Sequence, residues 1–175
     1  DLHRRRHSFP TRRSSDLIMK NVLIRACQKD MEKNDVMFTG TVKIIQEVYM
    51  VEVDDDHLKD VFEDSSVAKM MLRQPGWLQY YMLKHNEIKA LVDYIECIMD
   101  ELKSDKWKSL TENSFRELNQ TDKNQYVLQD AVYRSLKRIM VVIKEAERNY
   151  SAVVEAIKSQ GYILAAYVRR DGEIV

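Results

Sequence analysis

The chain has 175 residues, of which 28 are basic and 28 acidic, so its formal net charge is zero. It contains two cysteines, and no apolar run reaches the roughly eighteen residues that a membrane span needs. These values exclude a disulfide-stabilised secreted domain and a strongly basic polyanion-binding protein. We expect one domain with reduced thiols and no membrane contact.

Residues 7–17, HSFPTRRSSDL, look like one reading frame of a common sequencing adapter, so we predict that residues 1–17 are not native. A basic, disordered arm is the alternative interpretation. This segment holds five arginines and two aspartates, so 23 basic and 26 acidic residues remain without it, a net charge of −3. Binding to a polyanion would then need a local basic patch, or a patch repeated by oligomerisation.

Residues 18–49 are a doubtful N-terminal extension, because Met19, Met37 and Met50 are alternative starts of the native protein. The stretch from 18 to 35 is weakly amphipathic. Residues 36–53 are rich in valine, isoleucine, threonine and tyrosine, which favours a strand. We expect the native domain to cover residues 50–175.

A first long helix is predicted over about residues 76–110. Proline suits the first turn of a helix and not its interior, so the helix should begin close to Pro75. Two apolar rows with a spacing of seven residues share one helical face. One row is Tyr81, Ile88, Ile95 and Leu102, and the other is Trp77, Lys84, Leu91 and Ile98.

A second long helix is predicted over about residues 122–160, after a polar loop. Thr121 should cap its start, with Asp122 near its positive end, and Gly161 should stop it. Its face carries two similar rows. They are Val132, Ile139, Ala146 and Val153, and Leu136, Ile143, Tyr150 and Ile157.

An apolar stripe on a helix of about 50 Å cannot remain in water. Each long helix therefore needs a partner, and the other long helix is the nearest candidate. We predict an all-α fold, a long antiparallel helical hairpin with short N-terminal and C-terminal elements. Further copies of the chain would cover the apolar surface that remains.

The pattern of reactive side chains does not indicate an enzyme. There is no glycine-rich phosphate loop and no pair of cysteines or histidines at metal spacing, so we expect no catalytic site, metal or cofactor.

The basic residues gather in three places. They are Lys103, Lys106 and Lys108 around Trp107, then Arg134, Lys137 and Arg138, then Arg169 and Arg170. Lysines beside a ring suit a single strand, with cations on phosphates and the ring on bases. The alternative interpretation of the same pattern is that the lysines lie on a solvated charged face of the helix and that Trp107 is a core residue.

Four motifs along residues 50–175 resemble, in order and at similar spacing, those of the UvsY family of phage recombination mediators. The first two are residues 58–64, LKDVFED, and the block from Gly76-Trp77-Leu78 to Lys84-His85. Residues 102–107, LKSDKW, are similar to the family's LKxEKW block. Residues 156–162, AIKSQGY, are similar to its AIKSRGF run.

The resemblance implies a non-enzymatic protein of DNA recombination, repair and replication in the cytoplasm of an infected bacterium. Such a protein binds single-stranded DNA and forms a ring-like homo-oligomer. It loads a RecA-like, UvsX-type recombinase onto strands coated by the phage single-strand-binding protein. An alternative hypothesis is a helical oligomeric scaffold or assembly chaperone that does not bind nucleic acid.

The resemblance also implies site residues. The family's second DNA-contacting basic residue falls on Lys106, and its first falls on Ser104, beside Lys103, with Trp107 and Lys108 next along the chain. Oligomerisation falls to the C-terminal segment, residues 161–175. Its apolar residues are Tyr162, Ile163, Leu164, Tyr167 and Val168.

Overall fold

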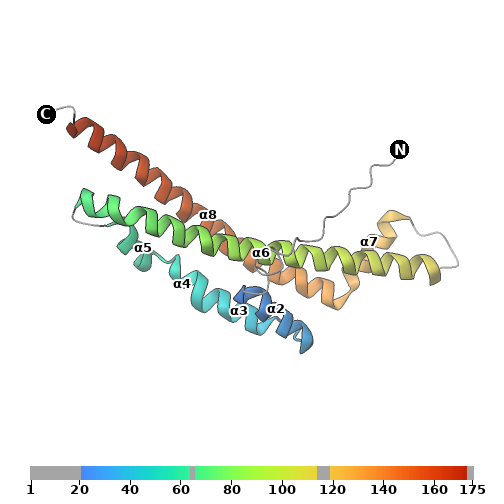
Figure 1. The fold of residues 1–175 in the computed structure, drawn as a ribbon. Helices are drawn as coiled ribbons and strands as arrows, with labels where there is room; N and C mark the ends of the chain where they lie inside the picture. The colour runs from blue at the N-terminus through green and yellow to red at the C-terminus, as the bar shows by residue number, and fades with distance from the viewer. Residues whose placement is uncertain (1–20, 64–65, 114–118, 173–175) are drawn as a thin grey trace.

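Helices make up the regular structure of the described residues, which are 21–63, 66–113 and 119–172 of a computed structural model (Figure 1). The predicted all-α class is confirmed over these ranges. The adapter-like segment lies outside them. The elements are α2 (Val22–Glu32), α3 (Thr39–Ile44), the π-helix η1 (Ile45–Tyr49), α4 (Met50–Glu52), α5 (Asp55–Phe62), α6 (Val67–Asn113), α7 (Gln120–Gln129) and α8 (Ala131–Gly172).

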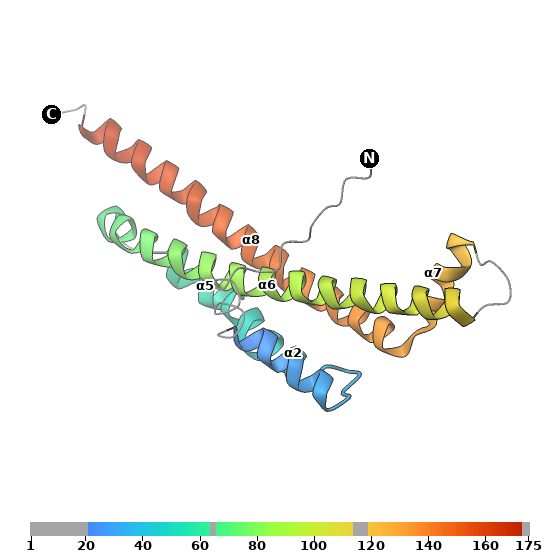
Figure 2. The same ribbon diagram turned by 45° about the vertical axis from the view of Figure 1, so that its right-hand side comes forward.

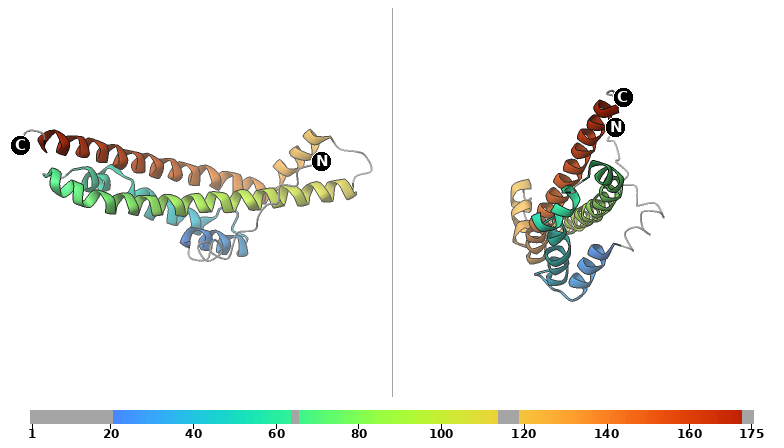
Figure 3. Two further views of the ribbon diagram at one scale, coloured as in Figure 1. Left: turned by 45° about the horizontal axis from the view of Figure 1, so that its top comes forward. Right: turned by 90° about the vertical axis from the view of Figure 1, so that its left-hand side faces the viewer.

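The two long helices, α6 and α8, lie side by side and run in opposite directions (Figure 3). Contacts between them pair residues in reverse order along the sequence. These are Gln74 with Ile157, Glu96 with Lys144, and Lys106 with Asp130, which immediately precedes α8. The end of α6 therefore meets the start of α8, which brings residues from distant parts of the sequence together.

The apolar rows predicted from the sequence form the interface between α6 and α8. The buried members are Tyr81, Ile88, Leu91 and Ile95 in α6, and Leu136, Ile139, Ile143, Ala146, Tyr150, Val153 and Ile157 in α8. Trp77, Ile98 and Leu102 pack against this core while remaining partly exposed. Two row members are exceptions. Val132, in the first turn of α8, is 42% exposed, and the side chain of Lys84 remains partly exposed beside Glu87. The seven-residue spacing thus predicted the core correctly.

The start of the first long helix was predicted wrongly, because α6 begins at Val67 and Pro75 lies inside it. The amide of Met70 already donates to the carbonyl of Ser66 at 3.1 Å, so the helix is established before the proline. Proline removes the bond to the carbonyl of Met71. Both Pro75 and Met71 are exposed, so water can reach this carbonyl, and the helix continues.

Gly161 does not end the second long helix, which continues to Gly172. The side-chain amide of Gln74 donates to the carbonyl of Ile157 at 2.7 Å and lies directly against Gly161. A Cβ atom at position 161 would overlap the Gln74 side chain. This glycine therefore permits close approach of α6 to α8 and has no capping role.

The connection between the long helices also differs from its prediction. Asn119, rather than Thr121, caps α7, because its Oδ1 accepts from the amide of Asp122 at 2.8 Å. Asp122 lies in the first turn of α7, as expected. Asp130 then separates α7 from α8 with an extended backbone, so the second long helix starts at Ala131.

The strand predicted over residues 36–53 is wrong, because residues 39–52 are helical. The buried side chains Thr41, Ile45 and Tyr49 are four residues apart, a spacing that places them on one helical face. Packing against the core outweighs the strand preference of β-branched residues.

Helices α2 to α5 form a third layer on one side of the α6–α8 pair (Figure 3). Leu23, Ile24 and Cys27 of α2 are fully buried in the common core. The Asn21 side chain caps α2 and donates to the carbonyl of Glu87 in α6 at 2.8 Å. Buried Asp30 accepts hydrogen bonds from the amide and hydroxyl of Thr41, both at 2.7 Å.

Glu52 joins the third layer to both long helices. Its carboxylate accepts from the hydroxyls of Tyr80 at 2.8 Å and Tyr150 at 2.9 Å, and its carbonyl accepts from Tyr81 at 3.0 Å. Burial and then Glu52 raise the pKa of Tyr80 to about 12. Next to this group, the hydroxyl of Tyr49 donates to Glu87 at 2.5 Å.

Replacing Val154 by alanine should lower the free energy of unfolding by about 2 kcal/mol. The change removes two methyl groups from a side chain that is only 5% exposed, and it leaves a cavity. Val141→Ala, on the same helix at 65% exposure, is the matched control and should change stability by less than about 0.5 kcal/mol. Urea unfolding followed by circular dichroism measures both, and equal losses would contradict the burial described.

The two cysteines should differ in reactivity. Cys27 is fully buried, and burial followed by the nearby Asp30 raises its thiol pKa to about 12, whereas Cys97 is exposed. At about pH 8 an aromatic disulfide reagent should titrate one thiol rapidly, and the second only after denaturation. Cys97→Ser should abolish the rapid phase. Two rapid thiols would show that α2 is not packed in the core.

Candidate nucleic-acid interface

The residues predicted to contact DNA lie on the last turns of α6, at the end of the molecule where α7 and the start of α8 also lie (Figure 2). The opposite directions of α6 and α8 produce this arrangement. The basic stretch near the end of α6 therefore lies close to the first turns of α8.

Lys103 and Trp107 form a cation–π pair along α6. The Nζ atom of Lys103 lies 4.9 Å from the centroid of the Trp107 ring, a distance at which an ammonium group is attracted to the ring face. Trp107 is half-buried, and its Nε1 atom is enclosed without a hydrogen-bond partner among the described residues. The indole therefore contributes to packing and offers only part of its surface for stacking.

Lys106 is held by an acidic residue from the start of α8. Its Nζ atom lies 3.0 Å from Oδ2 of Asp130, and the lysine side chain is 50% exposed while that of the aspartate is 17% exposed. The other carboxylate oxygen accepts from the amide of Tyr133 at 3.0 Å. That amide bond first, and then Lys106, lower the pKa of Asp130. The lysine that was predicted as the principal DNA contact is thus paired inside the chain.

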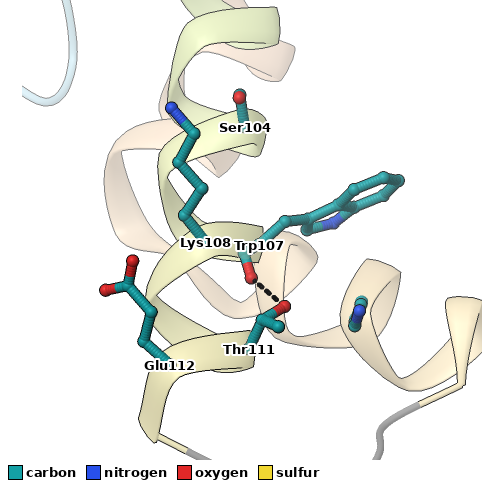
Figure 4. A pocket seen from close by; sticks show the side chains of 6 residues that line it. Ser104, Trp107, Lys108, Thr111 and Glu112 are labelled. Atoms are coloured by element: carbon teal, nitrogen blue, oxygen red, sulfur yellow. Dashed lines mark hydrogen bonds between the residues drawn. The ribbon is translucent and has the colours of Figure 1, made fainter.

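Lys108 is exposed and lines a shallow hollow at the end of α6 (Figure 4). Its side chain extends along the helix towards Ser104, whereas the ring of Trp107 projects away from α6. The hydroxyl of Thr111 donates to the carbonyl of Trp107 at 2.8 Å. The full lining is Ser104, Trp107, Lys108, Thr111, Glu112 and, from α7, Lys123.

A second cation–ring pair lies on α8, and its aromatic member was not predicted from the sequence. The Nζ atom of Lys137 lies 5.9 Å from the centroid of the Tyr133 ring. Tyr133 also lines a second hollow, together with Lys103 and Asn124. The four-residue spacing of lysine and ring is the same as for Lys103 and Trp107, so this signal was present in the sequence. The candidate interface therefore includes side chains from α6, α7 and α8.

The residues assigned to oligomerisation lie on the last turns of α8, which diverge from α6 (Figures 1 and 2). Tyr162, Ile163, Tyr167 and Val168 are exposed, Tyr162 by 77%. Leu164 differs, because it is only 6% exposed and packs within the chain. The start of α6 exposes further apolar side chains, including Leu72 and Leu83. Residues 173–175 of the assigned segment lie outside the described residues.

No family model, curated protein or solved structure matches this chain. Across the described ranges, no helix combines the length and apolar character needed to cross a bilayer. In the same part of the chain, no group of three or more histidine, cysteine, aspartate or glutamate side chains is placed to hold a metal ion.

Proposed function

We propose that this chain is a recombination mediator that binds single-stranded DNA and loads a RecA-like recombinase onto strands coated by single-strand-binding protein. The observation that supports the proposal is the cluster where α6, α7 and α8 meet. There, Lys103 lies against Trp107 and Lys137 against Tyr133, and both Lys103 and Tyr133 line one hollow. Cations that follow phosphates, with rings that stack on bases, are the elements of sequence-independent single-strand binding.

One copy of this cluster would bind DNA weakly. It presents few lysines, one of them already paired, on a chain whose residues beyond 17 are net acidic. Linked copies raise avidity by orders of magnitude without new contacts. The proposed mediator is therefore a ring-like homo-oligomer in which an antiparallel hairpin, formed by α6 and α8, presents the cluster once per subunit.

The proposed subunit contact is the apolar surface at the opposite end of the molecule. Tyr162, Ile163 and Tyr167 expose half or more of their surface there, and contiguous exposed apolar side chains mark interaction sites. Leu164 is not part of this surface. Its role would be to support the helix that carries the exposed residues.

Lys103→Ala combined with Lys106→Ala should weaken binding to a labelled oligo-dT by about tenfold or more. The loss is repeated in each subunit, and the dependence of log affinity on log salt should become shallower by about 0.7 for each phosphate that the variant no longer neutralises. Fluorescence anisotropy at several salt concentrations measures both effects. The control, Lys29→Ala with Lys33→Ala, removes two exposed charges from the α2 region and should have little effect.

The same titration tests the alternative function. A helical scaffold without nucleic-acid binding, for which the exposed apolar surfaces and half-buried Trp107 also provide a basis, would leave the anisotropy of the oligonucleotide unchanged at low salt. Equal binding by both double variants and the unaltered chain would exclude the end of α6 as the contact site.

Ile163→Asp combined with Tyr167→Ser should convert the oligomer to single chains, because a charge would be buried in each subunit contact. Light scattering after size exclusion measures the mass. Oligo-dT affinity should fall by about a hundredfold or more as avidity is lost. Val141→Asp places the same charge at an exposed site elsewhere on α8 and should leave the mass unchanged. An unchanged mass in the double variant would contradict the assigned contact.

A further inference from the structure

The two carboxylate oxygens of Asp130 make two different contacts, a hydrogen bond that caps α8 and an ion pair with α6. Oδ1 accepts from the amide of Tyr133 at 3.0 Å, three residues along the chain, which is the geometry of a helix N-cap. Oδ2 lies 3.0 Å from Nζ of Lys106. The cap bond thus fixes the carboxylate in place and directs its second oxygen towards the end of α6.

The paired lysine remains accessible from solvent. Half of the Lys106 side chain is exposed, whereas the aspartate is largely covered. An incoming phosphate can therefore approach the ammonium group without unfolding any helix, although it must compete with a preplaced anion. Neighbouring Lys103, whose Nζ lies over the Trp107 ring, has no such acidic contact within 4 Å among the described residues.

We propose that Asp130 acts as an internal substitute for a DNA phosphate and holds Lys106 in an autoinhibitory ion pair that a bound strand must displace. This inference rests on the proposed function. When a phosphate takes the ammonium group, Asp130 keeps its bond to Tyr133, so α8 stays capped while the cation changes partner. The exchange involves rotation of one side chain and no change of fold.

The strength of the pair suits such an exchange. A partly exposed lysine–carboxylate pair contributes a factor of up to about five to an equilibrium. That factor reduces the affinity of one subunit moderately. The same factor applies at every subunit engaged, but avidity over several linked subunits can exceed it, so strands that reach many subunits would be retained while a strand bound by one subunit dissociates.

Asp130→Asn should remove the ion pair and keep the cap. Asparagine is a good N-cap, so its side-chain oxygen can still accept from Tyr133 while the negative charge on Lys106 is lost. Oligo-dT affinity should rise about two- to fivefold for each subunit engaged, because the strand no longer has to displace a carboxylate from Lys106. Asp122→Asn, an acidic residue in the first turn of α7, is the control for the general loss of negative charge.

A double-mutant cycle with Lys106→Ala identifies the contact. The gain from Asp130→Asn should fall to the level of the Asp122→Asn control when Lys106 is absent. A gain that persists without Lys106, or that only equals the control, would overturn the autoinhibitory pair while leaving DNA binding established. Failure of every chain to bind, the unaltered one included, would overturn the proposed function and this inference together. Thermal unfolding of Asp130→Asn checks that α8 remains capped.

Discussion

The burial of one continuous apolar seam between α6 and α8 determines the rest of this structure. Side chains such as Ile88, Leu91 and Ile143 are completely covered there, and no other helix of the described residues is long enough to cover either stripe. Because the helices run in opposite directions, the seam also decides which residues become neighbours. It brings the basic end of α6 to the capped start of α8, and it leaves the start of α6 and the diverging end of α8, both with exposed apolar side chains, at the opposite end of the molecule.

The third layer adds specificity to this arrangement through polar contacts. An apolar seam with a seven-residue repeat still pairs its rows when one helix slides by seven residues, which is about two turns. Glu52 opposes such sliding, because its hydrogen bonds require Tyr80 and Tyr150 to be at the same level of the two long helices. A shift of either helix would leave a partly buried hydroxyl or carboxylate without a partner, which is energetically unfavourable.

The sequence predicted the core well and the helix ends poorly, for a physical reason. Burial of a long stripe depends on spacing, which is visible in the sequence, so the rows containing Ile95 and Ile157 were assigned correctly. The roles of Pro75, Gly161 and residues 36–53 depend on what lies opposite them. Pro75 is tolerated because its side of α6 is exposed, and Gly161 is needed because Gln74 crosses to α8.

In the candidate site, too, the spacing along one helix could be predicted from the sequence, whereas contacts between helices could not. Lys103, Lys106 and Trp107 could be selected from their order along one helix. The partner of Lys106 could not, since Asp130 has the character of a helix start and only tertiary packing places it within 3.0 Å. Tyr133 was not predicted, although its four-residue spacing to Lys137 is visible in the sequence, because a tyrosine among basic residues fits a solvated helix face equally well.

Gly161 also bears on the geometry of any larger assembly. Its position leaves room for the Gln74 side chain of α6, so the missing side chain permits the two helices to approach closely there, before the last turns of α8. The direction in which the final turns leave the body follows from that approach. In a closed ring, a small change in this direction alters the rotation between neighbours, and so the number of copies that complete the circle. In such a ring, a hydrogen atom in place of a methyl group at position 161 would therefore influence the number of subunits.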